Sequence, residues 1–361
     1  MDVPVQAEIV GGVDTHKDTH TAAAITTRGQ MLGHQTFPAT PAGYRDLLAW
    51  LAGLGTLIVV GMEGTSSYGA GLARYLAGQD VEVLEVDRPS RRTRRTLGKS
   101  DAIDAEAAAR SALARSRTAV PKAHDGTVEA IRNLRVARRS AMKARTQAIN
   151  QVHNLIVTAP EKLRESLRAL SGAALITACA ALRPDLTRTG EPAQAVKAAL
   201  RSLARRHQRL SDEIDELDAL LAPLVRQAAP DLLALFGAGT EAAGQLVVTA
   251  GQNPDRLHSE AAFAALVGAS PIPASSGKTN RHRLNRGGDR QANAALHTIV
   301  IVRMRHDPAT RAYVERRTAE GKTKKEIIRC LKRYVAREVY RALTTKTPQR
   351  ATPPQTESWA A

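Results

Sequence analysis

The first 86 residues contain an ordered series of apolar segments, and this order constrains the fold more than any other feature of the sequence. Three successive segments with strand character, at residues 8–14, 19–27 and 30–37, are separated by short polar turns. Short turns between consecutive strands predict an antiparallel meander. A helix is predicted from Pro41, because proline is favoured in the first helical turn and apolar residues then recur on one face.

Two further strands are predicted after this helix. Residues 56–60 are apolar and mostly β-branched, which is typical of a strand buried on both faces. A short helix at 68–77 then leads to a strand at 81–86. The order β-β-β-α-β-α-β predicts an α/β ribonuclease-H-like domain, in which a meander is extended by two right-handed crossovers.

A long helical region is predicted in the middle of the chain. Residues there recur with alternating steps of three and four, the a/d pattern of a heptad, at Leu200, Leu203, His207, Leu210, Ile214, Leu217, Leu221 and Leu224. A similar series upstream is interrupted by Arg138 and Arg145. We interpret the two series as the antiparallel helices of a coiled-coil stalk that acts as a spacer or dimerisation arm. A helical bundle within one globular domain is the alternative.

After Pro230 the sequence has the pattern of two helices joined by a tight glycine turn. Gly237 and Gly239 in this turn predict a helix-hairpin-helix whose amides contact phosphate, although an ordinary helical corner has the same pattern. We therefore expect a ribonuclease-H-like domain at 1–123, a helical coiled-coil stalk at 124–230, a small, mostly α-helical C-terminal domain at 231–350 and a disordered tail at 351–361.

Charge is divided unevenly along the chain. Residues 1–87 carry 4 basic and 10 acidic side chains, a net charge of −6, whereas the whole chain has a net charge of +17. Residues 278–350 alone carry 20 basic and 6 acidic side chains. Blocks of basic residues favour nucleic-acid binding over an evenly solvated basic surface. The candidate contacts are Arg91, Arg92, Arg94, Arg95, Lys99, Lys278, Arg281, Arg283 and Arg286.

The sequence also argues against several other classes of protein. Nowhere do about 18 apolar residues follow one another without an intervening charged residue, and the N-terminus lacks the pattern of a secretory signal. We therefore expect no membrane association. Cys179 and Cys330 lie far apart and predict neither a disulfide framework nor a thiolate metal site. We expect a cytoplasmic protein that acts at the nucleoid, in which oxygen atoms hold any metal.

Four carboxylates of the first domain are predicted to lie together. Asp14 ends the first strand, Glu63 follows the buried strand, and Asp101 and Asp104 share one face of a helix. Two Mg²⁺ ions about 4 Å apart can clamp the attacking and leaving oxygens of a phosphoryl transfer, and Mg²⁺ prefers carboxylate ligands. Each acid alone has a plainer interpretation as a turn, loop or helix N-terminal residue. Together, the four favour a site for two Mg²⁺ ions.

Short blocks of the sequence, in order, resemble a known family. They are Gly12-Val13-Asp14-Thr15-His16-Lys17, Glu63-Gly64-Thr65-Ser66-Ser67-Tyr68-Gly69, Lys99-Ser100-Asp101-Ala102-Ile103-Asp104-Ala105, Gly237-Ala238-Gly239, Leu266-Val267-Gly268-Ala269-Ser270-Pro271, Ser275-Ser276-Gly277-Lys278 and Arg286-Gly287-Gly288-Asp289. The first three resemble the RuvC-like domain of DEDD transposases from the insertion-sequence one-ten group of bacterial mobile elements. The others resemble the second domain of that family, and the resemblance covers nearly the whole chain.

The resemblance implies a chemistry and a set of partners. The four acids would bind Mg²⁺, and Ser276, with Ser275 as the second candidate, would attack DNA to form a phosphoserine link. Lys278, Arg281 and Arg283 would hold the phosphodiester, whereas a flexible Ser-Gly turn is the plainer interpretation. Relatives form homo-oligomers, up to tetramers, and use a structured non-coding guide RNA. The positive charge of this chain permits such an RNA but does not predict it.

We therefore expect a transposase, or site-specific DNA recombinase, that excises and inserts its own insertion sequence by Mg²⁺-dependent strand exchange. Two alternatives stay open. The first is a metal-dependent, junction-resolving endonuclease that uses water, and the second is a catalytically inactive nucleic-acid-binding protein. A Mg²⁺-dependent covalent DNA adduct distinguishes the recombinase from both.

Overall fold

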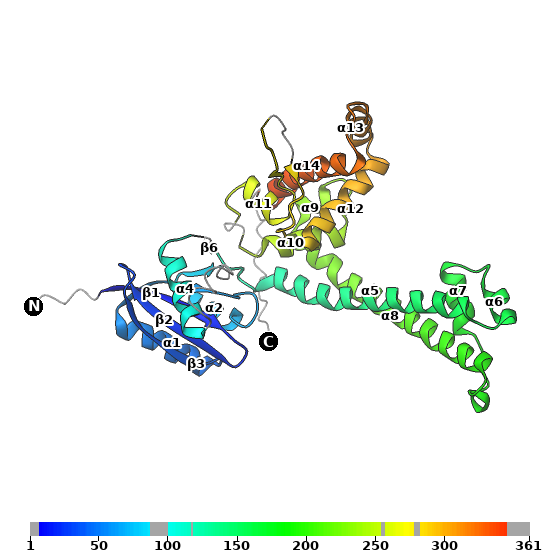
Figure 1. The fold of residues 1–361 in the computed structure, drawn as a ribbon, viewed down its shortest axis with the longest axis horizontal. Coiled ribbons are helices and arrows are strands. Elements are labelled where there is room, and N and C mark those ends of the chain that lie inside the picture. The colour runs from blue at the N-terminus through cyan, green and yellow to red at the C-terminus, as the bar shows by residue number, and fades with distance from the viewer. Residues whose placement is uncertain (1–6, 87–99, 117, 254–256, 278–281, 345–361) are drawn as a thin grey trace, which may run out of the picture. The chain divides into compact units, whose positions relative to one another are not determined.

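The computed structural model describes residues 7–86, 100–116, 118–253, 257–277 and 282–344. The chain divides into two compact units, residues 1–129 with 250–258 and residues 130–249 with 259–361 (Figure 1). Several predicted nucleic-acid contacts and the predicted disordered tail at 351–361 lie outside the described residues; the contacts are Arg91, Arg92, Arg94, Arg95, Lys99, Lys278 and Arg281.

The first unit contains a mixed six-stranded sheet in the order β3-β2-β1-β4-β5-β6. Its strands are β1 (Glu8–Thr15), β2 (Thr19–Thr26), β3 (Met31–Pro38), β4 (Thr56–Met62), β5 (Val83–Val86) and β6 (Thr118–Ala119). The first three form an antiparallel meander, β4 and β5 extend it in parallel with β1, and β6 pairs antiparallel to β5. The predicted order of elements is confirmed, and the mixed sheet is compatible with a ribonuclease-H-like domain.

Helices cover both faces of this sheet. Leucines of α1 (Pro41–Leu54) and α2 (Ala70–Ala77) share one buried cluster with Val60 and Met62 of β4. Ala109 and Ala112 of α4 (Asp101–Leu113) share another with Val10, on the opposite face. Successive residues of a strand point to opposite faces, so the consecutive apolar residues of β1 and β4 contribute to both clusters.

The backbone of α4 lies directly on two glycines of the sheet. A Cβ atom on Gly12 of β1 would lie 2.1 Å from the carbonyl oxygen of Ala105, and one on Gly61 of β4 would lie 2.4 Å from that of Ala108. The facing helix residues Ala105, Ala108, Ala109 and Ala112 are all buried. Small residues on both sides therefore allow the close approach that fixes the N-terminus of α4 relative to β1 and β4.

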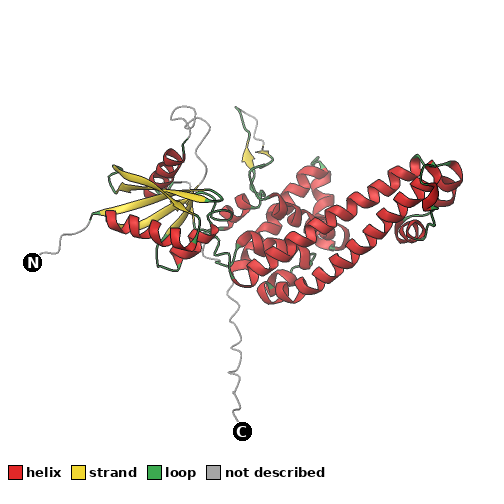
Figure 2. Cartoon of the chain, turned by 90° about the horizontal axis from the view of Figure 1, so that it is seen from below, coloured by secondary structure: helices red, strands yellow, loops and turns green. Residues whose placement is uncertain are grey.

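Two long antiparallel helices dominate the second unit (Figure 2). They are α5 (Gly126–Val157), of which residues from 130 belong to this unit, and α8 (Pro192–Ala228). Arg138 of α5 donates to Asp218 of α8, with Nη2 2.8 Å from Oδ2. Nearer the other end of the pair, Arg145 Nη1 lies 3.4 Å from Ser211 Oγ. The two arginines that interrupt the predicted upstream heptad thus have polar partners on the facing helix.

The predicted heptad of α8 covers two neighbouring stripes of the helix. The buried residues of the helix are Leu200, Ala204, Ile214, Leu221 and Val225. Four of the predicted positions, Leu203, Leu210, Leu217 and Leu224, are only half-buried. Because Ser211 and Asp218 contact α5, the seam between the helices follows their side of α8, and the four leucines flank it.

Shorter elements complete the second unit. They are α6 (Glu161–Leu167), α7 (Gly172–Ala180), the 3₁₀ turn Leu186–Arg188, α9 (Pro230–Ala234), α10 (Thr240–Ala250), α11 (Glu260–Leu266), β7 (Ile272–Pro273), β8 (His282–Arg283), α12 (Arg290–His306), α13 (Pro308–Ala319) and α14 (Lys324–Thr344). A capping box begins α14, because Thr323 N donates to Glu326 Oε2 at 2.9 Å. Among the described residues, no helix has the length and apolar character needed to cross a bilayer.

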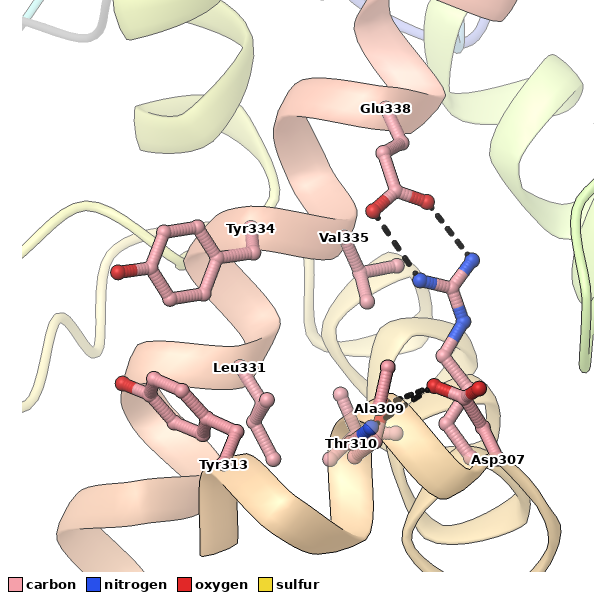
Figure 3. Close-up of a pocket in the computed structure, with 10 residues that line it drawn as sticks. Asp307, Ala309, Thr310, Tyr313, Leu331, Tyr334, Val335 and Glu338 are labelled. Atoms are coloured by element: carbon pink, nitrogen blue, oxygen red, sulfur yellow. Dashed lines mark hydrogen bonds and ion pairs between the residues drawn. The ribbon is translucent and has the colours of Figure 1, made fainter. Parts of the chain in front are cut away.

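A small pocket of about 250 Å³ lies where α12, α13 and α14 meet (Figure 3). The charged groups in its wall have partners within the unit. Arg303 Nη2 lies 2.8 Å from Glu338 Oε2, and Asp307 Oδ2 accepts a hydrogen bond of 3.0 Å from Thr310 N at the start of α13. Burial raises the pKa of Tyr313, whose ring meets that of Tyr334 edge-on, to about 12. We therefore assign this pocket to the packing of the three helices.

Candidate active site

Asp14 and Glu63 occupy the same edge of the sheet. In the parallel pair β1 and β4, Val13 lies opposite Met62, so the next residue of each strand follows at that edge. Glu63 N donates to Val13 O at 3.4 Å, and Thr15 Oγ1 donates to Glu63 O at 2.8 Å. Side chains alternate along a strand, so Asp14 is on the same face as Gly12, which contacts α4.

The first turn of α4 brings two more carboxylates to this edge. Ser100 caps the helix, and its Oγ accepts a hydrogen bond of 3.3 Å from Ile103 N. Asp101 and Asp104 then lie in the first turn, with Asp104 buried and Asp101 exposed. We call the edge that carries Asp14, Glu63, Asp101 and Asp104 the acid edge.

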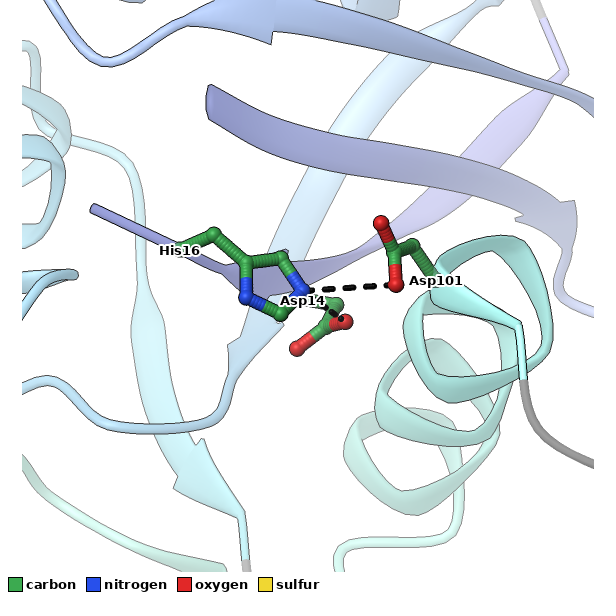
Figure 4. A group of neighbouring side chains, drawn as sticks. All are labelled: Asp14, His16 and Asp101. Carbon is green, nitrogen blue, oxygen red and sulfur yellow. Dashed lines mark hydrogen bonds and ion pairs between the residues drawn. The ribbon is translucent and has the colours of Figure 1, made fainter. Parts of the chain in front are cut away.

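Asp14 and Asp101 meet at the imidazole of His16 (Figure 4). His16 Nε2 lies 3.1 Å from Asp14 Oδ2 and 3.3 Å from Asp101 Oδ1, and one potential ligand atom from each of the three residues lies within 4.8 Å of the others. His16 was not among the site residues predicted from the sequence. A histidine two residues after an aspartate at a strand end was the available signal, because such residues point to the same side.

The environment of Asp14 disfavours its ionised form. Burial raises the pKa of Asp14, His16 opposes this effect, and the charges of Asp104, Asp101 and Glu63 raise that pKa further. A bound cation would offset the burial and the like charges that disfavour the ionised form of Asp14. The carboxylate oxygens of this edge, with an imidazole beside them, fit a divalent cation.

Ser276 lies at the end of a short hairpin in the second unit. Strands β7 and β8 pair antiparallel, with Ile272 opposite Arg283. Ser276 and the following Gly277 are exposed, and Gly277 has a positive φ of 54°. Arg283 and Arg286 are also exposed. The hairpin therefore presents its serine and two of the predicted arginines at the surface of its unit, whereas the four acids belong to the other unit.

A strongly basic pocket of about 840 Å³ lies between this hairpin and α14. Its basic lining residues are His282, Arg283, Lys322, Arg329, Lys332, Arg333 and Arg337, and its acidic lining residue is Glu326. Lys332 Nζ donates to Asn293 Oδ1 at 2.7 Å, and burial lowers the pKa of Lys332. The basic stretch as a whole was predicted from the sequence, but of this lining set only Arg283 was named there.

The glycine turn at Gly237 and Gly239 joins the short helix α9 to α10. Gly237 has a positive φ of 84° and packs against the backbone of Ile299 in α12. Arg303 Nε donates to Phe236 O at 2.8 Å, so α12 holds the turn in place. Gly239 is exposed. The contact of these turn amides with phosphate stays a prediction.

Comparison with known proteins agrees with the sequence resemblance. Residues 11–159 match a transposase family model of the IS110 DEDD type, and residues 229–315 match the model described as "Transposase IS116/IS110/IS902 family". A 43.6 kDa protein of insertion element IS110 from Streptomyces coelicolor is 33% identical over 109 residues, which cover 30% of this chain and 26% of that protein. A 42 kDa protein of insertion element IS900 from Mycobacterium paratuberculosis is 27% identical over 134 residues, which cover 36% of this chain and 34% of that protein.

The first matched range contains the four residues of the acid edge, and the second contains the glycine turn of the second unit. The matched segments span only about a quarter to a third of the length of the two relatives. On the two ordered model matches, the chain belongs to the IS110 family of insertion-element transposases.

Proposed function

We propose that this protein excises and inserts its own insertion sequence by DNA strand exchange, with Ser276 as the nucleophile. The observation that carries the proposal is the meeting of Asp14 and Asp101 at the acid edge, where burial, and to a smaller extent the charges of the other acids, raises the pKa of Asp14. Such a cluster of like charges does not stabilise the fold by itself, and clusters of this kind are typical of sites that bind a cation or a substrate. Family membership supplies the class of substrate, DNA.

The acid edge is the proposed site for two Mg²⁺ ions, held by Asp14, Glu63, Asp101 and Asp104. Bound Mg²⁺ supplies stabilisation of the negative charge that develops on the reacting oxygens. His16 has a different role in the proposal. Its Nε2 lies within hydrogen-bond distance of both Asp14 and Asp101, so it orients the two carboxylates relative to each other.

The second unit is proposed to hold nucleic acid. The basic pocket beside the hairpin offers several cations for phosphate groups, and Arg283 belongs both to the pocket and to the hairpin. Lys278, Arg281 and Arg286 would complete the contacts to the scissile phosphodiester, and Gly237 and Gly239 would bind neighbouring phosphates. The remaining positive charge, Arg91 to Lys99 included, is available for DNA ends or for a structured guide RNA.

The proposed domains are the RuvC-like domain at 1–123, the stalk at 124–230 and the C-terminal domain at 231–350.

A covalent protein–DNA species is the decisive measurement. End-labelled element DNA is incubated with the protein and Mg²⁺, and the products are separated on a denaturing gel. Wild type is expected to give an adduct that Ser276→Ala abolishes and Ser275→Ala reduces only modestly, because a serine alkoxide is needed for the link. Asp14→Asn is expected to lose the adduct while DNA binding is retained. An adduct that persists in Ser276→Ala places the nucleophile elsewhere.

The same assay distinguishes the two alternatives. Mg²⁺-dependent cleavage without an adduct identifies an endonuclease that uses water. Binding without cleavage identifies an inactive nucleic-acid-binding protein. A mixture of Ser276→Ala and Asp14→Asn proteins is expected to recover part of the activity if one site combines groups from two protomers, because one interface then contains both intact halves.

The half-buried leucines of α8 support a homo-oligomer. Leu210, Leu217 and Leu224 recur every seven residues beside the seam with α5, which is the spacing of a helix that packs on another helix, whereas Leu203 packs against a buried cluster of this chain. The double substitution Leu210→Asp and Leu217→Asp is expected to reduce the mass measured by light scattering, because buried carboxylates are costly. Gln208→Asp with Ala219→Asp, on exposed positions of the same helix, is the matched control. Equal masses for wild type and the leucine variant would exclude this stripe as the interface.

A further inference from the structure

A serine, a histidine and a glutamate of the first unit form a chain of hydrogen bonds that the proposed reaction does not yet use. Ser66 Oγ lies 3.0 Å from His124 Nε2, and His124 Nδ1 lies 3.1 Å from Glu129 Oε2. The histidine side chain is 8% exposed and that of the glutamate 20%, whereas Ser66 is exposed. A hydroxyl at the surface is thus connected through a buried imidazole to a mostly buried carboxylate.

The order of the three groups fixes the direction of the hydrogen bonds. A carboxylate only accepts hydrogen bonds, so His124 Nδ1 carries the proton that it donates to Glu129. Nε2 then has a free lone pair, and the Ser66 hydroxyl donates to it. This arrangement of hydroxyl, imidazole and carboxylate is the one that activates hydroxyl groups in nucleophilic catalysis on unrelated folds.

The backbone around His124 is held in the conformation that this contact requires. His124 has a positive φ of 54°, a left-handed conformation that non-glycine residues rarely adopt. Asn253 Oδ1 accepts a hydrogen bond from Ala123 N at 3.4 Å, and Gln252 Oε1 accepts one from Val128 N at 3.2 Å. Two side chains from a distant segment of the same unit therefore hold the chain on either side of the histidine. Unusual backbone conformations that are held in this way cluster at functional sites.

Ser66 is also close in sequence to the acid edge. It belongs to the loop that follows β4 and lies three residues after Glu63. In this loop Ser67 Oγ donates to Gly64 O at 3.1 Å, so of the two neighbouring serines it is Ser66 that bonds to the imidazole. We propose that Ser66, His124 and Glu129 form a proton relay that accepts the proton of the hydroxyl group attacking DNA at the acid edge.

The relay balances the proton of the reaction. The attacking hydroxyl transfers its proton to Ser66 Oγ while the Ser66 proton moves to His124 Nε2, and the imidazolium is stabilised by Glu129. The attacking oxygen forms its bond to phosphorus, the bond from phosphorus to the departing sugar oxygen breaks, and the same path returns the proton to that oxygen. This assignment rests on the proposed DNA cleavage, because it supplies that reaction with a proton acceptor.

Covalent labelling with a fluorophosphonate tests the relay without DNA or metal. The full-length protein is treated with the reagent, and the modified residue is located by peptide mass spectrometry. In the labelling step, Ser66 Oγ bonds to phosphorus, fluoride leaves, and His124 takes the serine proton. We expect modification of Ser66 in wild type and its absence in Ser66→Ala. The rate is expected to fall about 100-fold in His124→Asn, since asparagine tolerates the left-handed backbone but accepts no proton. Ser67→Ala is the matched control and should be labelled at the wild-type rate.

The cleavage assay supplies the second arm. Ser66→Ala and His124→Asn are expected to slow Mg²⁺-dependent DNA cleavage about 100-fold while both variants stay folded and bind DNA as the wild type does. An unlabelled Ser66 in wild type, an unchanged labelling rate in His124→Asn, or an unchanged cleavage rate in both variants overturns the relay. Failure of the proposed strand exchange is recognised separately, because hydrolysis without an adduct would still depend on a relay that is labelled normally.

Discussion

The acid edge and the serine hairpin carry the two halves of the proposed chemistry, yet they are built in opposite ways. At the acid edge, Asp14 and Asp104 are buried, and their strand and helix meet through backbone packing at Gly12. At the hairpin, Ser276 is exposed, and each of the paired strands β7 and β8 has two residues. The proposed metal ligands are therefore positioned by the core of their unit, whereas the proposed nucleophile lies on an exposed hairpin.

The strongest test of this contrast is Gly12→Val. A side chain at this position meets the backbone of α4 at 2.1 Å, so α4 must move and carry Asp101 and Asp104 with it. We expect a loss of about 3 kcal/mol in the free energy of unfolding, measured by urea denaturation, together with loss of DNA cleavage. Gly53→Ala in α1 is the control, because no described residue lies within 4 Å of the added Cβ.

Gly277→Ala provides the matching change in the hairpin. An added Cβ meets no described residue within 4 Å, but φ is 54°, so the cost is confined to the local backbone. We expect about 1 kcal/mol at most, since left-handed conformations cost alanine roughly this amount. An equal loss of global stability in Gly12→Val and Gly277→Ala would contradict the contrast between the two regions.

The second test concerns nucleic-acid binding by the basic pocket. Lys322→Ala and Arg329→Ala remove cations that line it. If each contacts a phosphate, DNA affinity falls and the slope of its logarithm against salt decreases by about 1 for each residue. Fluorescence anisotropy at several salt concentrations measures both quantities. Arg226→Ala, at an exposed position of α8, is the control. An equal effect of Arg226→Ala would mean that charge alone, rather than the pocket, determines binding.

The smallest effect concerns the pH dependence of the first unit. His20 of β2 is fully buried, stacks on Tyr44 with 5.7 Å between ring centroids, and has a pKa lowered by its burial. The unfolded chain therefore takes up the proton first as the pH falls below about 6.5, so stability is full above that pH and is lost as the pH falls through the folded-state pKa.

Urea denaturation at pH 7.5 and pH 5.5 measures this loss of stability. We expect His20→Phe to reduce it, because the ring is kept and the titrating group is removed. His34→Gln, an exchange of an exposed histidine on β3, is the control and should leave the loss unchanged. A wild-type pH dependence in His20→Phe would show that other groups determine the acid sensitivity of the acid-edge unit.

Local sequence patterns were sufficient for the part of the fold that repeats with a fixed period. The apolar segments at residues 8–14 and 56–60 predicted β1 and β4, and their parallel pairing follows from the intervening helix, so the sequence alone could place Asp14 and Glu63 at one edge. Ser100 directly precedes α4 and caps it, and serine is a residue type that marks a helix start in a sequence. The two-residue strand β6 could not be found, because so short a segment has no period.

Contacts between distant segments were beyond such patterns. Ser66 and His124 are 58 residues apart. The segment around His124 is held by hydrogen bonds to Gln252 and Asn253, which are still more distant in the sequence. In α8 the period was correct, but the sequence could not show which of two neighbouring stripes α5 covers. That choice depends on partners such as Asp218 and Ser211, which are polar and thus invisible to a search for apolar repeats.

The contacts between α5 and α8 are spaced so that the helix pair could be shortened or lengthened without changing its register. Arg138 faces Asp218, and Arg145, seven residues later, faces Ser211, seven residues earlier. Deleting one heptad from each helix beyond these contacts, towards the connecting segment, would shorten the pair by about 10 Å and keep both contacts. The same operation in reverse would lengthen it. A matched change of seven codons in each of two gene segments is therefore enough to change the length of this helix pair.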